Sequence, residues 1–366
     1  MWCFFLAIYL VQVLHFSVAQ SGYTLSFYAL GTALGSFIGG YMTDRWSPRT
    51  VSLIAPLLRG VIYFILVFST TFWVINPIVL LLGLTGYAFS VSNSAEVLSH
   101  CPNAEALVQA LSILRVATNV AFGFAGLLGG ILATQYGFRV VFLTLGGGAL
   151  IGNLIRIFQK QPEDTVVASL SQASSCQENE ERGKTKSLIF IVVLSVVFFV
   201  NLIYAQVSST YPIYIAHHFS VRTFAFFMSF NTIFVAFFSV PIHHYFKRRN
   251  KMMGLGLGGL LLGIGMLLLI FSSNLVWVFG AWGLFTLGEI IFLPMAQEIC
   301  YVACAPKKKG QALGWYRGMT AVSRTIGPVL GGGIYHHFGA LFVWIFCGVI
   351  GFASFMIGLL CKKHVS

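Results

Sequence analysis

The stretch Gly39-Gly40-Tyr41-Met42-Thr43-Asp44-Arg45-Trp46-Ser47-Pro48-Arg49 decides the fold of this chain. It joins two long apolar runs through a short loop that carries one acidic residue and two arginines. Small residues allow membrane helices to approach closely, and charged residues mark the place where a chain leaves the bilayer. The stretch therefore predicts a tight turn between two membrane-spanning helices.

The composition extends this prediction to the whole chain. Of the 366 residues, 57% are hydrophobic and only 9% are charged, and the mean hydropathy is +0.85. A soluble core needs far more polar surface than this. A membrane span takes roughly 20 apolar residues, and the long uninterrupted runs exclude a barrel of short alternating strands. The chain is therefore predicted to be an α-helical integral membrane protein.

The apolar runs give the expected spans. The first run, 2–14, is too short to cross a bilayer, and it lacks the basic start and cleavage site of a signal peptide. Eleven full spans are expected after it, at about 22–43, 51–69, 78–98, 107–134, 138–158, 188–216, 223–246, 252–271, 275–302, 310–336 and 340–361.

A polar segment and an internal repeat divide the chain. Residues 159–186 are polar and charged, which predicts a flexible cytoplasmic linker between two six-helix halves, 1–158 and 187–366. An offset of 202 carries Glu96 to Glu298, Gln109 to Gln311 and Arg115 to Arg317. Such a repeat is typical of transporters built from two parallel halves.

The repeat also indicates that the first helix is incomplete. The seventh span begins near Leu188, so its partner would begin about sixteen residues before Met1. Either the true start codon lies upstream, which we favour, or the chain is a shortened product.

The net charge of +12 is explained by the orientation of the chain in the membrane and does not indicate that nucleic acid is a partner. Sixteen of the 22 Lys and Arg residues lie in alternate loops or at their edges, whereas the opposite loops hold only Arg139 and Arg222. Positive charge accumulates on the cytoplasmic side of membrane proteins. The basic loops, and with them both native termini, are therefore predicted to face the cytoplasm. The sixteen are Arg45, Arg49, Arg156, Lys160, Arg182, Lys184, Lys186, Lys247, Arg248, Arg249, Lys251, Lys307, Lys308, Lys309, Lys362 and Lys363.

The opening stretch resembles the loop signature of the major facilitator superfamily, G-x-x-x-D-R-x-G-R-R. Gly40, Asp44, Arg45 and Arg49 match it, while Ser47 and Pro48 depart from it. The resemblance implies two six-helix bundles that transport a small molecule by alternating access. It also implies a cytoplasmic gate in which Arg45 couples with Glu96, and Arg248 with Glu298, assisted by Asp44 and Arg49. Gating and a static brace both remain open for these residues.

Glu289 is the strongest candidate for a proton or cation site. Its counterpart in the repeat is Tyr87, so internal symmetry does not explain it. It lies roughly 20 Å from the outer end of its helix at 1.5 Å per residue, and charges inside spans usually mark pathways or pairs. Competition between burial and a nearby arginine suits a carboxylate that exchanges protons. The alternative is a permanent pair with Arg317 or Arg324 that braces two helices.

Other polar residues within spans are candidates for substrate contact. They are Arg115 and Asn119, one turn apart on the fifth span, together with Tyr87 and Gln206. Membrane helices also use such groups for hydrogen bonds between helices. No phosphate-binding loop, catalytic triad or metal-ligand constellation stands out, so the sequence predicts neither an enzyme nor a cofactor or metal.

The sequence as a whole most resembles the short bacterial drug/proton antiporters of this superfamily, in residues 4–10 and 36–49. That likeness implies a monomeric efflux transporter of the cell inner membrane that exchanges protons for small lipophilic or amphiphilic compounds. An uptake symporter for a small anionic metabolite, using Arg115 and Arg317, is the alternative. A non-transporting sensor or remnant is a third reading, which the short first helix motivates.

Overall fold

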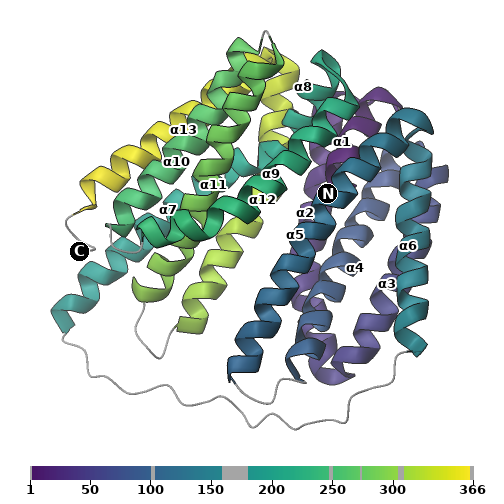
Figure 1. Ribbon diagram of the computed structural model, residues 1–366, viewed down its shortest axis with the longest axis horizontal. Helices are drawn as coiled ribbons and strands as arrows, with labels where there is room; N and C mark the ends of the chain where they lie inside the picture. Colours follow the sequence, from purple (N-terminus) through teal and green to yellow (C-terminus); the bar gives the residue numbers. More distant parts are fainter. Residues whose placement is uncertain are drawn as a thin grey trace. The chain divides into compact units, whose positions relative to one another are not determined.

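The structure is a computed structural model of the 366-residue chain. It describes residues 2–99, 104–158, 180–246, 250–272, 274–303 and 309–362, and all regular structure in these ranges is helical (Figure 1). Backbone N–H and C=O groups in a bilayer must form hydrogen bonds within the protein, and a helix forms them within a single segment. The all-helical fold that the composition predicts is confirmed.

The described residues group into two compact units. The first takes the described residues up to 170 together with Ile215–Phe226, and the second takes the rest. The first unit contains α1 (Trp2–Gln12), α2 (Val18–Arg45), α3 (Pro48–Phe68), α4 (Phe72–Ser99), α5 (Ala104–Gln135) and α6 (Phe138–Phe158).

The later helices follow in the same up-and-down order. They are α7 (Glu180–Ser208), α8 (Thr210–His218), α9 (Val221–Phe246), α10 (Lys251–Leu267) with the 3-10 turn η1 (Leu268–Phe271), α11 (Leu275–Ala303), α12 (Lys309–Phe338) and α13 (Ala340–Leu360). Because α7 and α8 form one interrupted span and η1 continues α10, the described helices make twelve consecutive segments.

Eight of these segments, within the described residues, are long and apolar enough to cross a membrane: 48–68, 72–97, 138–158, 190–218, 221–239, 251–271, 275–300 and 340–360. The helix α2 lies outside this set, yet its 28 residues exceed the roughly 20 that a span requires. The first helix, α1, has 11 residues and is as short as the sequence predicts.

Local capping moves two helix starts away from their expected positions. The helix α2 begins at Val18 rather than near Gly22, because the Ser17 side chain and Gln20 form a capping box. The helix α7 begins at Glu180, inside the segment expected as a linker. Its first three residues, two glutamates and an arginine, are of types that favour helices. The remainder of that linker, 159–179, lies outside the described residues.

Close approach of α2 and α4 forms the centre of the first unit. A Cβ atom added at Gly31 would lie 2.0 Å from the Leu80 carbonyl oxygen, and one at Gly83 would lie 2.3 Å from the Tyr28 carbonyl oxygen. Backbone meets backbone at this contact, so neither side can yield by changing a rotamer. The two glycines are therefore required for the helices to pack at this distance.

We expect Gly31→Ala to destabilise the protein by about 1–3 kcal/mol, since overpacking at a rigid contact costs this much. Gly40→Ala on the same helix is the matched control, because a Cβ atom there meets nothing within 4 Å. The comparison is made by thermal unfolding in detergent, followed by intrinsic fluorescence. Equal midpoints for the two variants would contradict the assigned α2–α4 contact.

Candidate functional site

Glu289 on α11 is held by two neutral donors from two other helices. The Tyr204 hydroxyl on α7 donates a hydrogen bond to Glu289 Oε1, and Asn231 Nδ2 on α9 donates to Glu289 Oε2 at 3.1 Å. The same amide nitrogen lies 3.0 Å from the hydroxyl of Thr286, one turn earlier on α11. The carboxyl group therefore ties α7, α9 and α11 together within the second unit.

Arg324 on α12 approaches this cluster without pairing directly with the acid. Its guanidinium carbon lies 5.5 Å from the centroid of the Tyr204 ring, within the range of a cation–π contact. Both Arg317 and Arg324 have exposed side chains. Among the described residues no ion pair joins Glu289 to either arginine. In place of the ion pair with Arg317 or Arg324 that the alternative requires, Glu289 is bonded to Tyr204 and Asn231.

Gln206 lies two residues beyond Tyr204, where the seventh span is interrupted. Its side chain is fully buried, and its amide nitrogen donates to the carbonyl oxygens of Leu202 at 3.1 Å and of Gly327 at 3.0 Å. The contact with Gly327 joins α7 to α12. Gln206 therefore contributes to packing between helices, a role that the sequence left open beside substrate contact.

The remaining membrane candidates are less informative. The Tyr87 side chain on α4 is 42% exposed, so it is accessible, although it belongs to the first unit. Arg115 and Asn119 lie on α5, but their side chains fall outside the described part of the chain.

Charges at one end of the first unit form a compact cluster. Arg156 Nη2 on α6 lies 2.6 Å from Glu96 Oε2 on α4. The Ser52 hydroxyl on α3 donates to the same oxygen at 2.6 Å, and Arg49 Nη2 lies 3.5 Å from the Arg156 carbonyl oxygen. Both partners of the ion pair are mostly buried, with side-chain exposures of 22% and 18%. The cluster connects the ends of α3, α4 and α6.

This cluster differs from the expected couple of Arg45 with Glu96. The Arg45 side chain is exposed and donates to the Tyr41 hydroxyl at 3.0 Å on its own helix, and Asp44 is also exposed. Arg156 takes the expected place of Arg45, because its side chain meets Glu96 whereas that of Arg45 bonds Tyr41. From the sequence alone, Arg156 is only one of the sixteen basic residues that indicate the side of the membrane.

The second unit carries a simpler version of the same contact. Lys251 Nζ, at the start of α10, lies 2.7 Å from Glu298 Oε1 on α11. The expected partner Arg248 lies outside the described residues. Each of the two equivalent acids therefore pairs with a base of its own unit, Glu96 with Arg156 and Glu298 with Lys251. These two bases are not equivalent in the repeat, because at the offset of 202 Lys251 corresponds to Arg49.

Comparison with known proteins decides the family. The sequence pattern of the Major Facilitator Superfamily matches residues 1–304 and again residues 249–364. The chain belongs to the major facilitator superfamily. It is therefore a multi-pass membrane transporter of the secondary type that binds a small-molecule substrate, and not an enzyme. The family that the loop signature indicates is thereby confirmed.

Individual relatives are distant. The chain is 25% identical over 345 residues to the uncharacterized MFS-type transporter YqjV of Bacillus subtilis (strain 168), an alignment that covers 92% of this chain and 82% of that protein. A POT family transporter in complex with a thioalcohol-conjugated peptide superposes with a TM-score of 0.82 at 13% identity, over 100% of this chain and 93% of that one. The nucleoside transporter NupG gives a TM-score of 0.75 at 15% identity, over 97% of this chain and 95% of that one. These structures share the fold.

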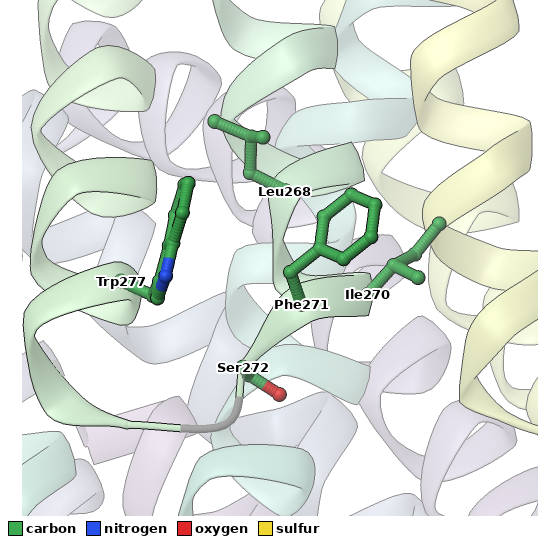
Figure 2. Close-up of a pocket in the computed structure, with 5 residues that line it drawn as sticks. All are labelled: Leu268, Ile270, Phe271, Ser272 and Trp277. Carbon is green, nitrogen blue, oxygen red and sulfur yellow. The ribbon is translucent and has the colours of Figure 1, made fainter.

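An apolar groove lies in the second unit, away from Glu289. It has a volume of about 670 Å³ and is lined by Leu268, Ile270, Phe271, Ser272 and Trp277. Figure 2 shows the Trp277 and Phe271 side chains on opposite sides of it. Trp277 precedes Glu289 by twelve residues on α11, or about 18 Å. None of the lining residues that the structure describes is charged, and we take the cluster around Glu289 as the candidate site.

We expect Arg156→Gln to lower the free energy of unfolding by about 1–2 kcal/mol, because the pair with Glu96 is mostly shielded from water and its loss leaves a carboxylate with fewer donors. Arg45→Gln is the matched control and should change stability by less than about 0.5 kcal/mol, as is usual for exposed residues. Chemical denaturation in detergent gives both values. A larger loss from Arg45→Gln than from Arg156→Gln would restore the pairing expected from the sequence.

Proposed function

We propose that this transporter couples proton movement to the export of small lipophilic or amphiphilic compounds, and that Glu289 carries the proton. The observation that supports it most is the bonding of the Glu289 carboxyl group to a tyrosine hydroxyl and an amide rather than to an arginine. A charged carboxylate inside a membrane span costs free energy. The groups that bond to it therefore indicate which protonation states the site can stabilise.

The bonding suits a carboxyl group that changes its protonation state. A tyrosine hydroxyl can donate or accept a hydrogen bond, whereas a guanidinium group can only donate. Tyr204 can therefore donate to an ionised Glu289 and accept from a protonated one. A bidentate arginine partner would favour only the ionised form. The site is suited to alternate between two states as the transporter alternates between two sides.

Exchange follows when a substrate competes with the proton for this carboxyl group. An amphiphilic cation that approaches Glu289 favours its ionised form, so binding releases the proton. The likeness to drug/proton antiporters in residues 4–10 and 36–49 supports export as the direction. In this proposal the protein works as a monomer in the cell inner membrane with both native termini in the cytoplasm, and the halves 1–158 and 187–366 move to give alternating access.

The charges at the cytoplasmic ends act as a gate in the same proposal. Asp44 and Arg45 are exposed, whereas Arg49, Glu96 and Glu298 contact residues of their own unit. We assign these contacts within each unit to bracing the helix ends, and the exposed charges Asp44 and Arg45, together with Arg248, to the contacts that change during transport.

A second candidate function is uptake of a small anion together with a proton, which the exposed Arg324 side chain favours. An anion bound at Arg324 neutralises the positive charge that helps to keep Glu289 ionised. Glu289 then takes up a proton more readily, so anion and proton bind together. Arg317 and Arg115 are further arginines available to this reading.

The sign of the proton change on ligand binding separates the two functions. We expect octyltrimethylammonium, added to purified protein in weakly buffered detergent at pH 7.5, to release up to one proton per protein. Glu289→Gln should abolish this release, whereas the control Glu298→Gln, which removes the acid paired with Lys251, should retain it.

Octanesulfonate, a permanently charged anion of matched chain length, tests the second function in the same assay. Proton uptake with the anion, and no release with the cation, would replace export by symport. If neither ion changes the proton balance in a way that depends on Glu289, proton coupling at this residue is refuted.

A further inference from the structure

The seventh span is broken next to the Glu289 site, and Gln206 fills the break. The helix α7 ends at Ser208 and α8 begins at Thr210, because Pro212 has no N–H group to continue the ladder. Gln206 Oε1 accepts hydrogen bonds from the Ser209 hydroxyl at 3.2 Å and the Thr210 hydroxyl at 3.0 Å. The side-chain oxygen thus bonds the residues at which the regular ladder is interrupted.

Both ends of the Gln206 amide are bonded to neighbouring protein groups. A glutamine side chain offers two donor hydrogens and two acceptor lone pairs. The nitrogen uses both donors on Leu202 and Gly327, and the oxygen accepts from Thr210 and shares the single Ser209 hydroxyl hydrogen with the Ala205 carbonyl oxygen. The group is also completely buried. Its role therefore lies in positioning other groups.

The helix α12 is shaped to receive this side chain. A Cβ atom added at Gly331 would lie 1.8 Å from Gln206 Oε1, and one at Gly327 would lie 2.3 Å from Ala205 Cβ. A larger residue at Gly331 would displace the amide. The bond between Gln206 and Gly327 therefore depends on a slot that only glycine provides.

Two contacts between α7 and α12 lie close together along both helices. Gln206 bonds Gly327, and two residues earlier Tyr204 lies under Arg324, three residues before Gly327. Both contacts require the same register of α7 against α12. If the Gln206 bond is lost, the Tyr204 ring is free to shift away from Arg324 and from Glu289.

We propose that Gln206 is a positioning residue of the proton site. By fixing the broken seventh span against α12, it holds the Tyr204 hydroxyl at the Glu289 carboxyl group. The inference rests on the proposed proton role of Glu289, and it adds that the proton affinity of this acid is set in part by a residue that does not touch it.

Infrared titration of purified protein between pH 5 and pH 9 tests the proposal. The carboxyl C=O band that Glu289→Gln removes reports protonation of Glu289, and the tyrosine C–O band that Tyr204→Phe removes reports the Tyr204 hydrogen bond. We expect Gln206→Met to shift the Tyr204 band and to change the proton affinity of Glu289 by about tenfold, the effect of one hydrogen bond to a charged group. Tyr204→Phe should change the affinity in the same sense, and the double variant should show no further change.

Matched controls separate positioning from a general loss of packing. Gly331→Ala, which displaces the amide from the other helix, should reproduce Gln206→Met. Gly333→Ala should not, because a Cβ atom there meets nothing within 4 Å. Asn201→Leu removes another buried amide of α7, whose nitrogen bonds only the Val197 carbonyl oxygen of its own helix, and should leave both bands unchanged.

Two different failures can be told apart. If the parent shows no carboxyl band that Glu289→Gln removes, the proposed proton role fails, and the Tyr204 band still decides whether Gln206 positions Tyr204. If the parent band is present but Gln206→Met and Gly331→Ala leave both bands in place, the positioning role is overturned. Additive changes in the double variant would overturn it too, because Gln206 would then not act through Tyr204.

Discussion

The second unit is organised around one carboxyl group that has no arginine bonded to it. Glu289 lies within a membrane span, where an unsatisfied charge would be prohibitive, and its two oxygens are satisfied from α7 and α9. Asn231 also bonds Thr286, which fixes the amide that serves the acid. Three helices must therefore meet at one depth. This requirement constrains the unit more strongly than apolar contact does, because an apolar helix surface is equally well accommodated by lipid tails and by a neighbouring helix.

The two halves repeat their acids but not the groups that satisfy them. At an offset of 202, Ser52 and Arg156 correspond to Gly254 and Gly358. In the first unit those side chains bind Glu96. In the second unit a Cβ atom at Gly358 would lie only 2.8 Å from Gly256 Cα, so α10 and α13 approach closely there and no arginine would fit. Lys251 therefore supplies the base for Glu298. The repeat preserves the location of the acids while the packing of the helices selects their partners.

The sequence predicts the parts of this protein that depend on one helix at a time. Long apolar runs and the loop around Asp44 are sufficient for the helical fold and the family, and the mismatch between Glu289 and Tyr87 makes this acid a candidate site. The partners Asn231 and Arg156 were not predicted, because they depend on the rotation and depth of one helix relative to another. The start of α7 at Glu180 was missed because charged residues that favour a linker are also good helix formers.

The Tyr204 ring gives Glu289 an electrostatic environment that a direct arginine pair would not. An arginine bonded to the acid would stabilise the ionised form so strongly that the proton would rarely bind, whereas an acid with no positive charge nearby would rarely lose it. Here Arg324 contacts the face of the Tyr204 ring, and the hydrogen bond to the acid comes from the Tyr204 hydroxyl, a group that can reverse its direction. If Glu289 carries the proton as proposed, this balance depends on where the Tyr204 ring lies, and the ring lies where α7 is held against α12. The proposal thus gives a single buried amide at a helix break an influence on the protonation of an acid that it does not contact.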